Sequence, residues 1–323
     1  MTSNPTPSRN DSFDIVVIGG GAAGLSGALT LGRARRSVLV IDAGEPRNAP
    51  AAHAHNYLGR EGIAPRELLA IGREEVARYG VVFRDGRVTR IEREHDGFRV
   101  RVADGTTMTA RRVLVATGLA DELPPVPGLA ERWGHDVLHC PYCHGWEVRD
   151  QAIGVLASGP LSVHQALLWR QWSDDVTLFL NDAVEPGDDD QRQLLARGIT
   201  IVAGAVDRLE SKEDELTGVV LADGRVVACR ALVVAPKFSA RAEPLAALGL
   251  AAAEQDRGGT VVGSAVVATD PTGRTEVPGV WVAGNVTDLF DTVATAVAAG
   301  TRSAAAINAD LVAEDTRLAV EAS

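Results

Sequence analysis

This chain has little cysteine, no excess of positive charge and no long uninterrupted apolar run. Only three of its 323 residues are cysteine. Its 43 Asp and Glu residues outnumber its 32 Lys and Arg residues, and the net charge of −11 disfavours a nucleic-acid partner or an anionic membrane, since both favour a basic face. Hydrophobic residues make up 46% and charged residues 23%, which is typical of soluble globular chains. The length leaves room for two domains.

The beginning of the chain lacks the apolar core of a secretory signal. Residues 1–12 are polar, include Pro5 and Pro7, and are predicted to form a disordered tail. The apolar run 15–31 is interrupted by five glycines, so it predicts a strand, a loop and a helix in place of a membrane span. We therefore expect a cytoplasmic protein without a membrane partner. In that reducing compartment a Cys-x-x-Cys pair is more often catalytic or metal-binding than structural.

Two of the three cysteines, Cys140 and Cys143, lie in the segment 139–144, whose sequence is HCPYCH. Two thiols at this spacing can close a small disulfide ring and reopen it, which makes the pair a two-electron carrier. The alternative is half of a zinc site. Four ligands packed into six residues cannot easily converge in tetrahedral geometry, and no second Cys-x-x-Cys follows, so no metal is expected.

A βαβ dinucleotide-binding unit begins near the N-terminus. Residues 14–18 predict a buried parallel strand, residues 25–35 a helix, and residues 37–42 the next strand. Asp42 at the end of that strand is placed to accept a hydrogen bond from a ribose hydroxyl. Three glycines in the first turn allow a tight bend, close approach of a pyrophosphate to backbone N–H groups, and packing of the helix on the strand. They are Gly19, Gly21 and Gly24.

A second unit of the same architecture has lost part of this chemistry. Residues 152–180 predict strand, turn, helix and strand. Ala157 and Ser162 stand where the first and third glycines belong, and Gly159 alone is left as a possible nicotinamide-site residue. A methyl group at the first position crowds the approach of a phosphate.

The remaining pattern completes two α/β units. Residues 86–104 predict an antiparallel excursion, and the proline-rich segment 123–128 predicts a hinge. A strand at 279–285 precedes an alanine-rich helix at 292–311. The chain is therefore predicted to have an α/β fold with two Rossmann-like, three-layer dinucleotide-binding domains.

In this order the motifs resemble the low-molecular-weight thioredoxin reductase-like flavoproteins over residues 13–312. The resemblance implies that the second domain is inserted into the first. An FAD-binding domain would comprise residues 13–119 and 240–312. The inserted NAD(P)-binding-like domain, residues 122–238, would carry the cysteine pair, and residues 313–323 would form a tail. The resemblance also implies a homodimer whose FAD lies against the redox pair.

The same resemblance assigns roles to single residues. Cys143 would lie beside the flavin, and Cys140 would be the interchange thiol that reacts with substrate. Asp42 would bind the ribose, and Asn56 would belong to the loop beside the isoalloxazine ring. The other residues implied to contact FAD are Gly19, Gly21, Ala22, Ala23, Gly24, Ala116, Thr117, Gly118, Gly284, Asn285 and Ala294.

His144 departs from the family pattern, because thioredoxin reductases carry a proton-shuttling acid at that place. A histidine, with a pKa of about 6.5, can shuttle a proton at neutral pH, and its cation would favour a neighbouring thiolate. The Cys-x-x-Cys-His motif resembles holomycin- and gliotoxin-type dithiol oxidases. An exposed histidine with no proton role is the alternative. His53 and His55 are further candidates for a base, against the alternative of solvated loop histidines.

The nucleotide site of the second domain departs as well. NADPH-using relatives have a His-Arg-Arg cluster after its second strand, where this chain has the acidic segment 181–185. Each carboxylate there would disfavour a 2′-phosphate by on the order of 1 kcal/mol. NADH or another binding mode stays open. Near the flavin, Asn285 replaces the usual Asp, and Thr292 and Val293 replace an Arg-Gln pair.

The sequence thus predicts an FAD-dependent thiol–disulfide oxidoreductase that oxidises a small-molecule dithiol through Cys140 and Cys143, with His144 handling the proton. Oxygen or NAD(P)H would exchange electrons with the flavin. Two alternatives remain at this point. One is an NAD(P)H-dependent reductase of a thioredoxin-like protein, and the other is a non-catalytic flavin redox sensor.

Overall fold

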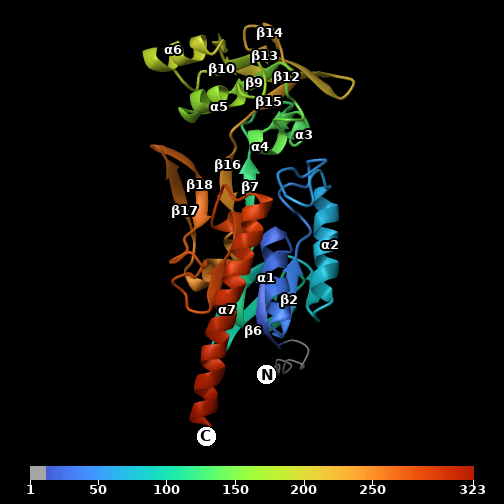
Figure 1. Cartoon of the computed structure of the whole chain (residues 1–323). Helices are drawn as coiled ribbons and strands as arrows, with labels where there is room; N and C mark the ends of the chain where they lie inside the picture. Colours follow the sequence, from blue (N-terminus) through green and yellow to red (C-terminus); the bar gives the residue numbers. More distant parts are fainter. Residues whose placement is uncertain (1–11) are drawn as a thin grey trace.

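The computed structural model describes residues 12–323, and Figure 1 shows their arrangement. The predicted tail at residues 1–12 lies outside the described residues except for Ser12, the first residue of strand β1 (Ser12–Ile18). Two bodies lie one above the other in the figure, one built on a mixed sheet and the other on a parallel sheet. The α/β fold with two Rossmann-like units predicted from the sequence is confirmed.

A seven-stranded sheet forms the body at the two chain ends, in the order β3-β2-β1-β6-β5-β4, with β19 also paired to β6. The strand β1 pairs in parallel with β2 and β6. Its side chains alternate, so Ile15 and Val17 pack on one face and Val16 and Ile18 on the other. The other strands are β2 (Val38–Asp42), β3 (Val82–Asp85), β4 (Val88–Glu94), β5 (Gly97–Val102), β6 (Thr107–Val115) and β19 (Val280–Val282).

Helices α1 (Ala22–Arg33) and α7 (Val293–Glu321) pack against each other beside this sheet, and α2 (Pro65–Ala77) packs on α1. Small residues make the contact between α1 and α7 close. A Cβ atom on Gly300 would lie 2.0 Å from the carbonyl oxygen of Ala23. This close crossing fixes the beginning of both helices near one end of the sheet.

The second body contains a five-stranded sheet in the order β11-β10-β9-β15-β8 and a three-stranded antiparallel sheet, β12-β13-β14. Its βαβ unit is β9 (Ile153–Leu156), α5 (Leu161–Trp169) and β10 (Val176–Phe179). The other elements are α3 (Leu129–Arg132), β8 (Val137–Leu138), α4 (Pro141–His144), α6 (Asp188–Ala196), β11 (Thr200–Val202), β12 (Val206–Lys212), β13 (Glu215–Leu221), β14 (Val226–Ala228) and β15 (Ala231–Val233).

A four-stranded sheet, β17-β18-β16-β7, contains the two segments that lead from one body to the other. The segments β7 (Leu119–Glu122) and β16 (Lys237–Ala240) pair antiparallel. The remaining strands are β17 (Ala252–Arg257) and β18 (Thr260–Val266), and two short 3-10 helices are η2 (Glu243–Leu248) and η3 (Gly284–Val286). The local sequence pattern does not predict this sheet.

Helix α7 continues ten residues beyond the predicted end at residue 311. Residues 313–321, predicted as a tail, are therefore helical. Residues 301–321 contain neither Gly nor Pro, and ion pairs hold this part of the helix to the body. Asp315 pairs with Arg36 at 2.7 Å, and Arg112 pairs with Asp310 at 2.6 Å. No helix within residues 12–323 is both long enough and apolar enough to cross a bilayer.

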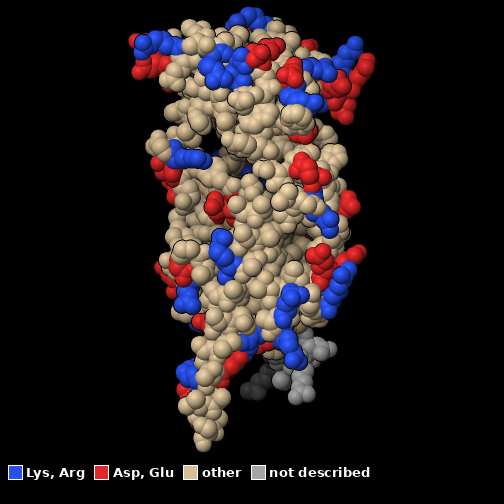
Figure 2. All heavy atoms as spheres, viewed as in Figure 1, with Lys and Arg blue, Asp and Glu red and all other residues tan. Residues whose placement is uncertain are grey.

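On the face shown in Figure 2, acidic and basic side chains are interspersed, and a hollow separates the upper body from the lower one.

Candidate active site

A cavity of about 760 Å³ lies between the two bodies. The first turn of α1, the end of β2, the end of β6 and the loop 46–56 line it from the seven-stranded body. The cysteine pair and His144 line it from the other body. Its volume is in the range of cofactor and ligand pockets in proteins.

The glycine turn before α1 is shaped for close approach of a ligand. Gly19 has φ +103°, and a Cβ atom there would lie 2.3 Å from the carbonyl oxygen of Ala116. A Cβ atom on Gly24 would lie 1.9 Å from the carbonyl oxygen of Gly19, so only glycine allows the helix to pack on the turn. Gly21 is the N-cap residue of α1, and no side chain caps the helix. Nothing lies within 4 Å of a Cβ atom built on Gly21.

The open N-terminus of α1 therefore fits a phosphate. Its first backbone N–H groups have no capping side chain, and Ala22 and Ala23 line the cavity. Asp42, at the end of β2, accepts a hydrogen bond from the backbone N–H of Gly20 at 2.9 Å through Oδ1. Its Oδ2 lies 3.8 Å from the guanidinium of Arg73 and does not accept the hydrogen bond from Gly20. Asp42 can thus hold the turn with one oxygen and a ribose hydroxyl with the other.

Other residues that the resemblance implies to contact FAD also line the cavity. Ala116, Thr117 and Gly118 follow β6 and line the cavity, as do Gly284, Asn285 and Asn56. The Thr117 hydroxyl donates to the carbonyl oxygen of Arg241 at 2.7 Å, so its side chain holds the backbone of the return segment.

Asn285 has a role that the sequence did not reveal. Its Nδ2 donates to the carbonyl oxygens of Asp288 and Asp291, both at 3.0 Å, and so holds the loop that leads into α7. Burial raises the pKa of Asp291, which lines the same cavity. An Asp in place of Asn285 would have no N–H to donate to these carbonyl oxygens.

Ala294, which the resemblance implies to contact FAD, is not among the residues that line the cavity. It is exposed in the first turn of α7, whereas Thr292, Val293 and Ala296 line the cavity. The physical reason is the helical period. Residues three and four positions apart share one face, and Ala294 is rotated by about 100° from Val293.

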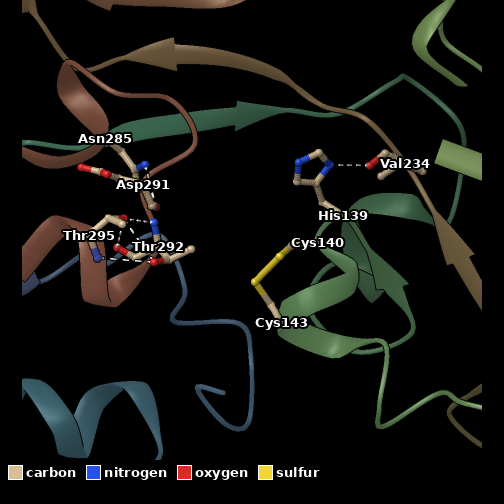
Figure 3. The surroundings of a disulfide bond; sticks show 8 residues. All are labelled: His139, Cys140, Cys143, Val234, Asn285, Asp291, Thr292 and Thr295. Carbon is tan, nitrogen blue, oxygen red and sulfur yellow. Dashed lines mark hydrogen bonds between the residues drawn. A yellow bond between two sulfur atoms is a disulfide. The ribbon is translucent and has the colours of Figure 1, made fainter. Parts of the chain in front are cut away.

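Cys140 and Cys143 form a disulfide with a Cα–Cα distance of 5.3 Å. Cys140 is the N-cap residue of the short helix α4, and Cys143 lies one turn later. Figure 3 shows the disulfide projecting from α4 toward the group that contains Asn285 and Thr292. Both cysteines and both of these residues line the cavity. A flat group held in the cavity would thus have the disulfide on one of its walls.

His139 directly precedes Cys140, is partly buried and also lines the cavity. Its Nδ1 lies 3.1 Å from the carbonyl oxygen of Val234, and its ring meets Phe238 edge-on with the centroids 5.3 Å apart. Burial lowers the pKa of His139, with the charge of Arg47 acting in the same direction. Figure 3 shows its ring turned toward Val234 and away from the two sulfurs. These contacts support a packing role for His139.

The pKa of His144 is lowered. Burial lowers its pKa, the charge of Glu147 raises it, and the charge of His55 lowers it. The net result is a pKa below the usual value of about 6.5 for histidine. At neutral pH the imidazole is therefore mostly uncharged, and it lies in the same cavity wall as the cysteine pair.

His53 and His55 also line this cavity, with their ring centroids 6.1 Å apart. The structure adds two acids that sequence reasoning missed. Nδ1 of His55 lies 2.8 Å from Glu61, and its Nε2 lies 3.4 Å from Glu147. The sequence offers one signal for Glu147, which follows His144 by three residues, and none for Glu61.

The second dinucleotide turn is closed by its own side chains. The Ser162 hydroxyl accepts a hydrogen bond from the backbone N–H of Ser158 at 3.1 Å, and Ser162 is 2% exposed. After β10, Asn181 accepts from the backbone N–H of Val206 at 2.9 Å. A Cβ atom on Gly159 would meet open space. A side chain therefore takes one of the N–H groups that a dinucleotide phosphate could use.

The sequence pattern of the pyridine nucleotide-disulphide oxidoreductase family matches residues 13–300. The chain belongs to this family. Proteins of this family generally bind FAD and NAD(P)H. A curated relative, thioredoxin reductase sirT of Leptosphaeria maculans, is 30% identical over 320 residues, which is 94% of this chain and 95% of the relative.

Other relatives match over a shorter region. The chain is 38% identical to a probable thioredoxin reductase of Arthroderma benhamiae over 189 residues, which span 55% of this chain and 46% of that protein. It thus spans about half the length of that relative. Among solved structures, the crystal structure of HlmI is similar with a TM-score of 0.90 and 48% identity, covering 99% of this chain and 98% of HlmI.

Proposed function

We propose that this protein uses FAD to oxidise a small-molecule dithiol to a disulfide through the Cys140–Cys143 pair. The observation that carries the proposal is that the pair and His144 line the same cavity as the glycine turn and Asp42. The uncapped helix N-terminus, the glycine cradle and the volume of the cavity all fit FAD. Bound there, FAD would accept two electrons from the reduced pair.

Each of these residues has its own role in the proposed reaction. The α1 N-terminus holds the pyrophosphate, and Asp42 holds the ribose. A substrate thiolate attacks Cys140, the interchange thiol, and the second substrate thiol resolves the mixed disulfide. His144, uncharged at neutral pH, takes the proton of the attacking thiol. The Cys-x-x-Cys-His motif, which resembles that of dithiol oxidases, supports this direction of reaction.

The closed second turn supports oxygen over a nicotinamide as the electron acceptor. The Ser158–Ser162 hydrogen bond and the acidic segment 181–185 both oppose a phosphorylated nucleotide. The test is to mix the holoprotein with dithiothreitol in air and to record oxygen consumption and peroxide. Absence of both would refute the oxidase direction.

The second candidate is an NAD(P)H-dependent reductase of a thioredoxin-like protein. It is favoured by the open space at Gly159 and by the names of the relatives. Fast anaerobic bleaching of the flavin by NADPH, with slow bleaching by dithiothreitol, would support this candidate. A third candidate, a flavin redox sensor, predicts that Cys140→Ser abolishes partner binding in a protein that shows no turnover.

We also propose the domain division that the resemblance implies. An FAD-binding domain comprises residues 13–119 and 240–312, and the inserted domain comprises residues 122–238. The homodimer and the cytoplasmic location remain predictions, and sedimentation of the holoprotein tests the first of them.

A further inference from the structure

His55 lies between two carboxylates that come from different bodies of the fold. Its Nδ1 is 2.8 Å from Glu61, in the loop between β2 and α2, and its Nε2 is 3.4 Å from Glu147, just after α4. The side chain of His55 is 18% exposed, whereas those of Glu61 and Glu147 are 63% and 40% exposed. With a carboxylate at each ring nitrogen, a proton can arrive at one nitrogen while another leaves from the other.

His144 is coupled electrostatically to this group. The charge of Glu147 raises the pKa of His144, and the charge of His55 lowers it. The charged and titratable groups that face His55 are thus Glu61 and His53 from its own loop, and Glu147 and His144 from the other body. Together they connect the wall of the cavity at the cysteine pair to an exposed acid at the surface.

We propose that His55 is a positioning residue that relays protons between His144 and solvent, by way of Glu147, which is 40% exposed, and Glu61, which is 63% exposed. This inference rests on the proposed function. An outlet is needed because a second turnover requires an uncharged His144 beside the cysteine pair, and burial disfavours keeping the charge there.

The protons and electrons balance as follows. A substrate dithiol loses two S–H bonds and gains one S–S bond, and the Cys140–Cys143 bond breaks. The two electrons pass to the cysteine pair. One proton remains on the Cys140 thiol, and Cys143 is left as a thiolate. The other proton is taken by His144 and leaves through Glu147, His55 and Glu61 to water.

The experiment compares His55→Gln and Glu147→Gln with the wild-type holoprotein. His95→Gln is the matched control, because its side chain is 97% exposed beside Asp96 in the turn between β4 and β5. Circular dichroism and FAD content check that each variant folds. The first readout is the pH dependence of iodoacetamide alkylation of the reduced cysteine pair, followed by mass spectrometry. The second is the solvent deuterium isotope effect on anaerobic flavin bleaching by dithiothreitol.

The two variants should shift the alkylation profile in opposite directions. Glu147→Gln removes a negative charge and moves the profile to lower pH, whereas His55→Gln removes a group that lowers the pKa of His144 and moves it to higher pH. His55→Gln should also slow bleaching about tenfold, below the effect of a direct acid–base residue, and added imidazole should restore part of the rate. His95→Gln should behave as wild type.

Two results would overturn the proposal. One is a His55→Gln profile and isotope effect equal to those of the wild type. The other is a rate that falls equally at every pH with the isotope effect unchanged, which would mean that His55 only supports the loop. If dithiothreitol fails to bleach the wild-type flavin, the proposed function fails, but the alkylation profiles still decide on His55 because they need no flavin turnover. If a His55 variant does not fold, Glu61→Gln tests the last step of the same path.

Discussion

Arg47 and Asp121 form a two-pronged ion pair beside the cavity. Nε of Arg47 donates to Oδ2 of Asp121 at 2.9 Å, and Nη2 donates to Oδ1 at 2.7 Å. The Asp121 side chain is only 8% exposed, and the guanidinium lies over the Phe238 ring at 4.9 Å from its centroid. The pair ties the loop after β2 to β7, one of the two segments that lead between the bodies.

Replacing Arg47 should therefore be costly. In an Arg47→Met protein the Asp121 carboxylate stays buried without its counter-ion, and we expect unfolding to become easier by about 3–5 kcal/mol. Arg87→Met is the control, because Arg87 and its partner Glu45 are both about half exposed, and its effect should be far smaller. Urea denaturation measures both. Equal effects of the two substitutions would contradict the assignment of the Arg47 pair as a buried one.

Two substitutions in the glycine turn should have different effects, one on folding and the other on FAD binding alone. A Gly24→Ala methyl group would meet the Gly19 carbonyl at 1.9 Å, so we expect this variant to unfold at lower temperature and to purify without FAD. Gly21→Ala should fold normally but bind FAD more weakly, since its methyl group would project into open space at the phosphate site. Gly187→Ala, at the N-cap of α6 with a similar extended backbone, should change neither property. Calorimetry and flavin absorbance check these outcomes.

The two cysteines should behave differently when one is removed. In Cys143→Ser the proposed interchange thiol Cys140 has no resolving partner, and we expect it to displace the leaving thiol of an activated disulfide and to remain as a stable mixed disulfide. In Cys140→Ser the remaining Cys143 should react far more slowly with the same reagent. Intact-mass spectrometry after incubation with an activated disulfide measures both. Faster labelling of the Cys140→Ser protein would reverse the two assignments.

The rate of flavin reduction by a dithiol should decrease at low pH. His144 accepts a proton only when uncharged, and burial lowers its pKa, so the rate should rise with pH through that lowered pKa and level off before neutrality. His144→Gln should remove this limb and slow the reaction by about 10²–10⁴-fold. Anaerobic stopped-flow spectroscopy from pH 4.5 to 8 records the profile. An unchanged acid limb in His144→Gln would assign it to another group.

Stability should also fall in acid because of His139. Burial lowers the pKa of His139 in the folded protein, so below about pH 6.5 the unfolded chain binds a proton that the folded chain excludes. The free energy of unfolding should therefore decrease as pH falls from about 6.5 toward the lowered pKa. His139→Gln should reduce this slope, and the part that remains should come from His144, whose pKa is also lowered, whereas the exposed His95→Gln should leave the slope unchanged. Urea titrations at several pH values decide.

The local elements could be predicted from sequence because each depends on neighbouring residues. The β-branched run before Gly19 and the acid at Asp42 predict a βαβ unit, and the structure has it at β1, α1 and β2. The antiparallel excursion is present as β4 and β5. The disulfide is present at Cys140 and Cys143, because its spacing is set within one helical turn. The sheet that joins the two bodies was missed, because its strand β7 lies far along the chain from β16, with which it pairs.

The sequence by itself determined the fold class, the phosphate turn and the redox pair, because backbone sterics and spacing act over a few residues. Only the tertiary structure decided which groups face each other. It placed Glu147 beside His55, and it brought the amide of Asn285 to the carbonyl oxygen of Asp291 in the loop before α7. It also left Ala294 outside the residues that line the cavity. It also closed the second turn on Ser162. These relationships depend on packing between distant segments, and no local pattern encodes such packing.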